Sequence, residues 1–337
     1  MPHGPDPVRA LVVGLGSIGR RHARNWVRAG LGEVLVCRQA GLAQPQPLGV
    51  PVQEFHALDE ALAERPDVVL VTNPTSLHVQ TALRALETGA HVFIEKPVSN
   101  TLDGVPRLLK QAQDRVVMVG YNLRFHPGLQ RLRQLLHRGA IGKPLSIRAE
   151  VGEYLPAWHP WEDYRRSYSG RKELGGGAVL TFSHELDAVY WLLGEPASVT
   201  AVTAHVSALE IDTEDVAEIV LTFPSGALAS IHLDYVRRPA RRQVEIVGEE
   251  GVVRWEYDAN RILRYAPATR EWLVEEGDPR FERNDMYVAE LREFAALARG
   301  EGQTRLGANA RQGAAVLRIA LAALQSAHEG RRVDVHD

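Results

Sequence analysis

Cysteine is almost absent from this chain. Cys37 is the single cysteine among 337 residues, so no internal disulfide can form, and such usage favours a reducing cytosol. The chain has 13 histidines, yet no Cys/His cluster has the spacing of a zinc site. We therefore predict a protein without disulfides and without a metal site.

Long apolar runs and an excess of basic charge are missing as well. No apolar run approaches the roughly 18 residues that span a membrane. The first residues, MPHGPDP, lack the apolar core of a secretion signal. Lys and Arg number 39 against 42 Asp and Glu, which leaves no basic excess for nucleic acid. We expect a cytoplasmic protein without a nucleic-acid or membrane partner, and 337 residues suffice for two domains.

What the chain does contain, close to its start, is a G-x-G-x-x-G sequence. A short apolar strand at 10–13 ends in Gly14, Gly16 and Gly19 complete the motif, and a helix is predicted over 18–29. In a dinucleotide site the first glycine permits the tight turn and the second leaves room for the pyrophosphate. The third lets the helix pack on the strand, and the helix N-terminus then faces the phosphates. The alternative is a strand-to-helix turn that binds no ligand.

The choice of coenzyme depends on the end of the second predicted strand, 33–38. An acidic residue there would bind the ribose hydroxyls of NAD, but this chain has Cys37 and Arg38. A cation without a nearby carboxylate favours the 2′-phosphate of NADP. We expect NAD(P) as cofactor, with NADP(H) favoured over NAD(H); alternatively, Arg38 stacks on the adenine or points to solvent.

Strands and helices alternate through the first third of the chain. Further strands are predicted at 52–55, 67–72, 91–95 and 116–120, and helices at 58–64, 75–88 and 102–113. Continuous Val/Ile/Leu strands indicate a parallel sheet covered on both faces, which binds ligands at the carboxyl ends of its strands. The residues expected to face the cofactor are Gly14, Gly16, Ser17, Ile18, Gly19, Arg38, Thr72, Asn73, Pro74, His78, Glu95, Lys96, Pro97 and Asn122.

The pattern changes after about residue 125. Helices are predicted at 127–138 and 179–193, on either side of a strand at 146–154 and an irregular segment at 156–177. Strands at 198–206, 215–223, 227–237, 242–247 and 252–257 follow without helices, which indicates an antiparallel sheet with hairpin turns at Ser225-Gly226 and Glu250-Gly251. Helices at 284–298 and 308–328 close the chain. We predict a dinucleotide-binding domain over 1–124, a substrate and oligomerisation domain over 125–283, and C-terminal helices over 284–337, the last packing back on the first domain.

Four motifs occur in a fixed order: GLGSIGRRH, EKP, GYNLRFHP and GGGAVLTFSHELD. Together they resemble the Gfo/Idh/MocA family, which includes glucose–fructose oxidoreductase and inositol dehydrogenase. The resemblance implies an α/β protein with a Rossmann domain and a second α/β domain. The second domain would carry a large, mostly antiparallel open-faced sheet that often forms the interface of a homodimer or homotetramer. It also implies NAD(P)-dependent oxidation or reduction of a sugar or cyclitol carbon.

Lys96 and His184 are the residues expected to carry the chemistry. Hydride transfer requires the carbinol carbon to be held against the nicotinamide while a base removes the hydroxyl proton. Lys96 follows a strand end, where its ammonium can stabilise the developing alkoxide, and the family often has a cis bond at the position of Lys96-Pro97. His184 is the candidate base because its ordinary pKa suits reversible proton transfer. The alternatives are a surface lysine and a structural histidine.

The acid–base assignment departs from the family pattern at one position. The family commonly has an aspartate shortly before the histidine, where this chain has Thr181. A threonine can hydrogen-bond substrate but carries no charge. Asp187, three residues after His184 on the same helix face, can orient the imidazole or cap buried polar groups. The roles of Thr181, His184 and Asp187 therefore stay open.

A further set of side chains is expected to meet the substrate. Arg124 can bind hydroxyls or a carboxylate, or instead form an interdomain salt bridge. Aromatic and polar side chains of the irregular segment suit the faces of a sugar ring, although they can equally serve packing. The predicted substrate residues are Arg124, Tyr154, His159, Tyr164, Arg165 and His184.

Three functions remain to be weighed. The first is a sugar or polyol dehydrogenase or reductase. In the second, nicotinamide stays tightly bound and serves transient oxidation during glycoside cleavage or elimination, as in some members of the resembled family. The third is a regulator that senses NADP without catalysis, against which the presence of Lys96 and His184 argues.

Overall fold

The computed structural model describes residues 7–40, 47–160 and 162–335. The start of the chain, where no secretion signal is expected, lies outside these residues up to position 6. The chain forms two compact units, one from Met1–Phe125 with Glu282–Ala314 and the other from His126–Phe281 with Ala315–Asp337. Within the described ranges, no helix is long and apolar enough to cross a membrane.

The first unit is built on a sheet of the order β15-β6-β5-β4-β1-β2-β3, parallel except for β15. Its central strands are buried at every position, which explains their continuous apolar sequences. The predicted parallel sheet is therefore confirmed. Its strands are β1 (Ala10–Val13), β2 (Val34–Cys37), β3 (Gln53–Phe55), β4 (Val68–Val71), β5 (His91–Ile94), β6 (Val117–Val119) and β15 (Ala308–Asn309).

Helices from both ends of the chain pack in this unit. The early helices are α1 (Ser17–Arg28), α2 (Leu58–Ala63), α3 (His78–Glu87) and α4 (Val105–Gln111). The late helix α8 (Arg283–Ala298) packs on α1, where the side chains of Asn25 and Asn284 exchange amide hydrogen bonds of 3.0 Å. The helix predicted from residue 102 begins only at Val105, because Gly104 adopts a left-handed conformation (φ 73°).

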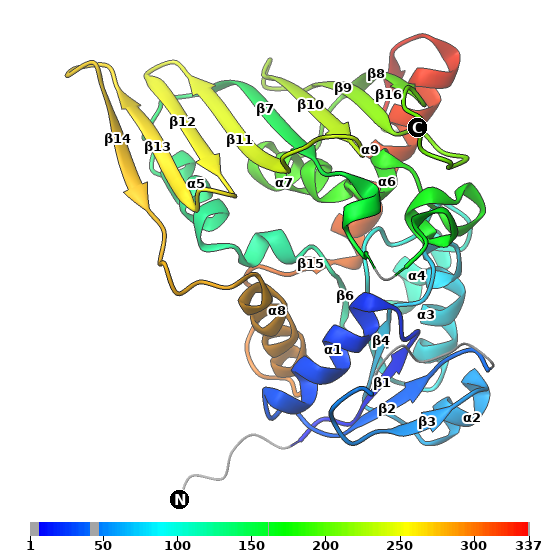
Figure 1. The fold of residues 1–337 in the computed structure, drawn as a ribbon. Coiled ribbons are helices and arrows are strands. Elements are labelled where there is room, and N and C mark those ends of the chain that lie inside the picture. The colour runs from blue at the N-terminus through cyan, green and yellow to red at the C-terminus, as the bar shows by residue number, and fades with distance from the viewer. Residues whose placement is uncertain (1–6, 41–46, 161, 336–337) are drawn as a thin grey trace, which may run out of the picture. The chain divides into compact units, whose positions relative to one another are not determined.

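The second unit is built on a nine-stranded sheet of the order β14-β13-β12-β11-β7-β10-β9-β8-β16, seen as one broad layer in Figure 1. Its pairs are antiparallel except for β7 with β10, so the prediction of a large, mostly antiparallel sheet is confirmed. Its strands are β7 (Pro144–Gly152), β8 (Ser198–Ala204), β9 (Val216–Thr222), β10 (Leu228–Asp234), β11 (Arg241–Gly248), β12 (Gly251–Glu256), β13 (Arg261–Ala266), β14 (Glu271–Glu276) and β16 (Val333–Asp334).

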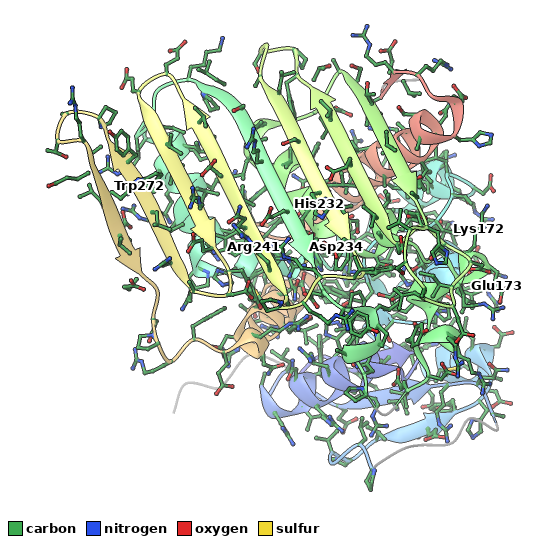
Figure 2. All side chains as sticks on the ribbon, turned by 45° about the horizontal axis from the view of Figure 1, so that its top comes forward. Lys172, Glu173, His232, Asp234, Arg241 and Trp272 are labelled. Carbon is green, nitrogen blue, oxygen red and sulfur yellow. The ribbon has the colours of Figure 1, made fainter. Side chains whose placement is uncertain are left out.

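Helices cover one face of this sheet, and the other face is open. Contacts with the sheet come from α5 (Pro127–His137), α6 (Ala178–Thr181) and α7 (Ser183–Leu193), which lie below the strands in Figure 1. The single helix predicted over 179–193 is thus wrong: Phe182, with φ −93° and ψ 28°, separates α6 from α7. Figure 2 shows the open face, from which polar side chains project.

The end of the chain serves both units. Helix α9 (Ala310–Glu329) starts two residues later than predicted, because Ala308 and Asn309 pair with β6 as β15. Gly313 lies against the side chain of Val119 in the first unit. From Ala315 onward the helix belongs to the second unit, where the Ser326 hydroxyl accepts the backbone N–H of Ala201 at 3.0 Å.

The hairpins of the second unit agree with the prediction at one turn and differ from it at two places. The predicted turn at Ser225-Gly226 is present, with Gly226 at φ 86°. The next turn is formed by Glu249 and Glu250, because Gly251 is already paired with Gly248 across β11 and β12. The segment after residue 257, for which no element is predicted, contains the additional hairpin β13–β14.

Candidate active site

The glycine turn at the end of β1 has the shape that a dinucleotide requires. Gly14 is at φ 97°, and a Cβ there would lie 2.6 Å from the backbone nitrogen of Asn73. A Cβ on Gly19 would lie 2.0 Å from the carbonyl oxygen of Gly14. On the exposed Gly16, in contrast, a Cβ would meet nothing within 4 Å. The turn therefore closes tightly on itself while leaving open space at Gly16, at the N-terminus of α1, so these residues fit a pyrophosphate.

Side chains at the ends of β4 and β5 brace this turn. The Thr72 hydroxyl donates to the carbonyl of Gly14 at 2.7 Å, and the Asn73 amide donates to the Thr81 hydroxyl at 2.9 Å. His78 lies between the carbonyl oxygens of Asn73 and Pro97, each 2.9 Å from a ring nitrogen. Burial lowers the pKa of His78, and its hydrogen bonds to the two carbonyl oxygens oppose that shift.

The structure at the end of β2 contradicts one premise of the coenzyme prediction, namely that Arg38 has no carboxylate nearby. Arg38 is not without a nearby carboxylate, because its Nε donates to Oε1 of Glu54 at 2.8 Å. Two further arginines of α1 lie in the same electrostatic environment. Burial lowers the pKa of Arg20, and the charges of Arg24 and Arg38 lower it further. This end of the sheet thus combines three guanidinium groups with the Glu54 carboxylate.

Lys96 is the second residue after β5 and is partly exposed. The Lys96–Pro97 bond is cis. Glu95 before it is 8 % exposed, and its carboxylate lies 2.6 Å from Nε2 of His22. Asn122, in the 3-10 turn Asn122–Phe125 after β6, is 3 % exposed. Lys96 is therefore the most accessible of these polar groups at the end of β5.

The remaining predicted catalytic residues belong to the second unit. His184 and Asp187 lie one turn apart on α7; His184 is half-buried, and Asp187 is 1 % exposed. Thr181 is the last residue of α6, in front of the break at Phe182. Burial raises the pKa of Tyr235 well above its ordinary value, and a hydrogen bond with the Thr181 hydroxyl opposes that shift. Thr181 is thus engaged with a buried phenol.

A buried ion pair fixes α7 against the sheet. Nε of Arg242, on β11, donates to Oε1 of Glu185 at 2.7 Å, and both side chains are at most 9 % exposed. Burial raises the pKa of Glu185 in spite of this pair. Breaking such a pair would leave an unpaired buried charge, which is unfavourable. The pair therefore fixes the position of α7 and, with it, that of the neighbouring His184.

The predicted substrate residues have varied surroundings. Arg124 is 1 % exposed and donates to the Gln312 side chain at 3.1 Å, within the first unit. The guanidinium of Arg238 stacks on the Tyr154 ring, 3.8 Å from its centroid. The Tyr164 hydroxyl accepts the Glu210 backbone N–H at 3.3 Å, and His159 is half-buried.

Arg165 differs from the other predicted substrate residues because it is exposed and its charge is compensated. It pairs with Asp163 at 2.8 Å and with Glu210 at 2.9 Å. These two carboxylates occupy the donors that we expected to be directed at a sugar.

Sequence reasoning missed three residues that shape these sites. His22 stands in the GLGSIGRRH motif, but its contact with Glu95 spans 73 positions. Glu54 meets Arg38 only because β3 pairs with β2. Arg242 reaches Glu185 across 57 positions. The GLGSIGRRH motif could have drawn attention to His22, whereas no sequence pattern marks Glu54 or Arg242. Among the described residues, no group of three or more His, Cys, Asp or Glu side chains could hold a metal ion.

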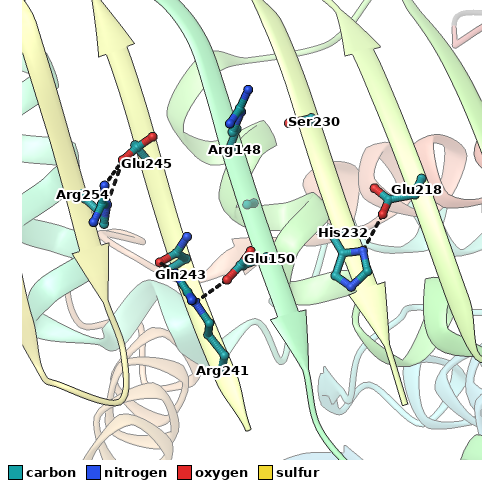
Figure 3. A pocket seen from close by; sticks show the side chains of 10 residues that line it. Arg148, Glu150, Glu218, Ser230, His232, Arg241, Gln243, Glu245 and Arg254 are labelled. Carbon is teal, nitrogen blue, oxygen red and sulfur yellow. Dashed lines mark hydrogen bonds and ion pairs between the residues drawn. The ribbon is translucent and has the colours of Figure 1, made fainter. Parts of the chain in front are cut away.

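A pocket lies on the open face of the second unit's sheet, and its lining includes none of the predicted catalytic residues. Figure 3 shows its charged side chains arranged across β12, β11, β7, β10 and β9. Arg254 bonds Glu245 and Arg241 pairs with Glu150. His232 lies 2.6 Å from Glu218 and 3.0 Å from Asp234, and these carboxylates raise its pKa to about 9. The open face therefore carries a ladder of cross-strand ion pairs.

Two family models match successive segments of the chain. The model described as an oxidoreductase family with an NAD-binding Rossmann fold matches residues 8–123. The model described as the GFO/IDH/MocA C-terminal domain matches residues 129–254.

Individual proteins similar to this chain include a myo-inositol 2-dehydrogenase of Thermotoga maritima, 30% identical over 83% of this chain and 81% of that protein. A 2,7-anhydro-N-acetylneuraminate hydratase of Escherichia coli is 31% identical, over 62% of this chain and 57% of that protein. The crystal structure of the WlbA dehydrogenase of Bordetella pertussis in complex with NADH and UDP-GlcNAcA is also similar. It superimposes with a TM-score of 0.83 at 25% identity, covering 99% of each chain.

Proposed function

This chain belongs to the Gfo/Idh/MocA family of NAD-binding oxidoreductases, and from that premise we propose that it transfers a hydride between nicotinamide and a carbon of a sugar, sugar derivative or cyclitol. The reacting carbon is a carbinol in one direction and a carbonyl in the other. The observation that carries the proposal is the space left open at Gly16 within an otherwise tightly closed turn. A structural strand-to-helix turn has no need of that space.

Each catalytic side chain has one task in this proposal. The bound nicotinamide would accept or supply the hydride. Lys96 donates a hydrogen bond to the reacting oxygen and stabilises its negative charge as the proton leaves. His184 takes that proton in oxidation and returns it in reduction. Asp187 and Thr181 act near His184, and the Arg242–Glu185 pair holds the helix from which it projects.

The direct test is a screen of substrates with both coenzymes. Sugars, sugar acids, cyclitols and nucleotide-sugars are incubated with NAD and NADP in parallel, and the nicotinamide absorbance is followed. We expect turnover with at least one carbinol. Failure of the purified protein to bind either nicotinamide coenzyme, measured by calorimetry, would refute the proposal.

We favour NADP(H) as the coenzyme because three guanidinium groups lie near the end of β2, of which Arg38 pairs with the Glu54 carboxylate and the other two donate to backbone carbonyl oxygens. Replacing Arg38 by alanine is expected to raise the KM for NADPH about 10- to 100-fold and that for NADH less than about threefold, because a phosphate–guanidinium bond is lost. Steady-state kinetics with both coenzymes measure this. Glu54→Gln is the matched control, and removal of its charge should improve NADPH relative to NADH. An equal loss for both coenzymes in Arg38→Ala would contradict the preference.

A second function is favoured by the similarity to a hydratase. In that reading nicotinamide stays bound, and a transient oxidation assists elimination or glycoside cleavage. Product formation without a net change in nicotinamide absorbance would distinguish it from a dehydrogenase. A regulator that senses NADP without catalysis is less well supported, because it would not require Lys96 or His184.

We also propose that the open sheet face joins copies of this chain into a homodimer or homotetramer. The face carries exposed apolar side chains, including Val220 at 43 % and Leu228 at 50 % exposure, beside its ion-pair ladder. Solvent-exposed apolar groups on an uncovered sheet are typical of an interface. A cytoplasmic location remains a prediction that rests on the single cysteine.

Adding charge to this face is expected to separate the copies. Light scattering should give the wild type a mass of a multiple of 37.3 kDa, and the Val220→Glu/Leu228→Glu variant the mass of one chain. The reason is that like charges would be buried without partners. Leu102→Glu, which alters a side chain of 42 % exposure in the first unit, is the control. A monomeric wild type would contradict the interface.

A further inference from the structure

His22 occupies a closed position beneath the predicted catalytic lysine. It lies on α1 with 0 % exposure, and its Nε2 is 2.6 Å from Oε1 of Glu95, the residue before Lys96. The rings of Phe93 and Tyr287 meet the imidazole edge-on, with centroids 5.3 and 6.0 Å away. Every element in this contact belongs to the first unit.

The protonation of the pair follows from the Glu95 carboxyl. Burial raises the pKa of Glu95, but the hydrogen bond and charge of His22 and the charge of Lys96 outweigh burial, so the pKa is lowered. Glu95 is therefore a carboxylate at neutral pH and can only accept. His22 must donate from Nε2, and its buried Nδ1 has no hydrogen-bond partner among the described residues. Within the part of the chain that the structure describes, Glu95 is thus the only hydrogen-bond partner of this imidazole.

The second oxygen of the same carboxylate reaches the backbone of the next residue. Oε2 of Glu95 accepts the N–H of Lys96 at 3.2 Å. One carboxylate therefore connects a buried ring on α1 to the peptide from which the Lys96 side chain projects. It also keeps a negative charge beside the Lys96 ammonium.

We propose that His22 is a positioning residue for Lys96, acting through Glu95. This rests on the proposed function, in which Lys96 binds the reacting oxygen. Without the Nε2 donor, Glu95 would be a buried carboxylate lacking its shortest hydrogen bond, and it would turn or take up a proton. Either change releases the Lys96 peptide and removes the neighbouring charge. His22 then affects turnover although it touches neither cofactor nor substrate.

The experiment compares His22→Leu and His22→Gln with a control on β5, the strand that precedes Glu95. Glutamine can still donate near the position of Nε2, whereas leucine cannot. His91, at the opposite end of β5, accepts the Val116 backbone N–H at 2.9 Å, so His91→Leu removes a histidine hydrogen bond far from Lys96. The kcat, the KM values, the pH profile of kcat/KM and the melting temperature are measured for each variant.

We expect His22→Leu to lower kcat about 10- to 100-fold with the coenzyme KM nearly unchanged, and to shift the pH profile, since loss of such supporting contacts typically costs that much. His22→Gln should recover most of the activity. His91→Leu should reduce the melting temperature without altering kcat. A purely structural role is indicated, and the proposal overturned, if His22→Leu behaves as His91→Leu does or if glutamine recovers no more activity than leucine.

A second measurement does not depend on turnover. Hydrogen–deuterium exchange of peptides spanning Lys96 should be faster in His22→Leu than in the wild type, because the Lys96 amide loses its acceptor, and unchanged in His91→Leu. Unaltered exchange at Lys96 in His22→Leu would overturn the proposal. Absence of turnover in the wild type, in contrast, would refute the proposed function while leaving this test intact.

Discussion

Replacing Lys96 by methionine is expected to lower kcat by about three orders of magnitude while coenzyme affinity stays within about threefold. Methionine has a similar length but can neither donate to the reacting oxygen nor stabilise its charge. The coenzyme is held mainly by the glycine turn and the N-terminus of α1, which this change leaves intact. Stopped-flow turnover with an active substrate and calorimetric titration of the coenzyme separate the two effects.

The matched control for Lys96→Met is Lys110→Met in the last turn of α4, where the side chain is exposed. It should leave kcat unchanged. Full activity in Lys96→Met would exclude Lys96 from the chemistry and would strengthen the reading as a regulator. A parallel loss of coenzyme affinity would mean that Lys96 binds the coenzyme instead of stabilising the reacting oxygen.

Two substitutions in the glycine turn are expected to impair the protein in different ways, one by weakening coenzyme binding and the other by destabilising the fold. Gly16→Val should fold with nearly the melting temperature of the wild type, because Gly16 has an ordinary extended backbone and a Cβ there meets no atom within 4 Å. It should nevertheless weaken coenzyme binding about 100-fold or more, since the valine fills the space for the pyrophosphate. Gly19→Ala should instead destabilise the fold by about 1–3 kcal/mol or more, because its Cβ would lie 2.0 Å from the Gly14 carbonyl oxygen.

Thermal unfolding and calorimetric titration of the same samples distinguish the two outcomes. Each variant serves as the control for the other, since both lie in one turn and differ only in where the added atoms go. If the Gly16→Val protein binds nicotinamide coenzymes normally, the pyrophosphate does not bind at this turn. A Gly19→Ala protein as stable as the wild type would show that the turn can relax.

Local chemistry made much of the first unit predictable. The apolar strand before Gly14 and the helix after it follow from a change of hydrophobic period and from the three glycines. The same reasoning predicted the succession of strands along the chain, including the strand that leads into Glu95 and Lys96. Sequence periodicity carries this information because each of these strands is buried on both faces.

Other features depend on contacts that no local pattern contains. Strand β14 was not predicted because its residues are exposed or half-buried, so no alternation of apolar and polar positions marks it. The break at Phe182 interrupts a continuous apolar pattern. Glu54 changes the environment of Arg38 only through the register of β2 with β3. The partner of His22 is likewise set by how α1 lies on β5, which the motif does not specify.

The discontinuity of the two units has a consequence for synthesis of the chain on the ribosome. The dinucleotide-binding unit begins first but is completed only by Glu282–Ala314, which supply α8 against α1 and β15 beside β6. Until then a nascent chain exposes an open strand edge at β6 and leaves the ring of His22 without its cover from Tyr287. Most strands of the second sheet emerge in that interval. The first unit therefore reaches its complete set of contacts only after translation has passed Ala314.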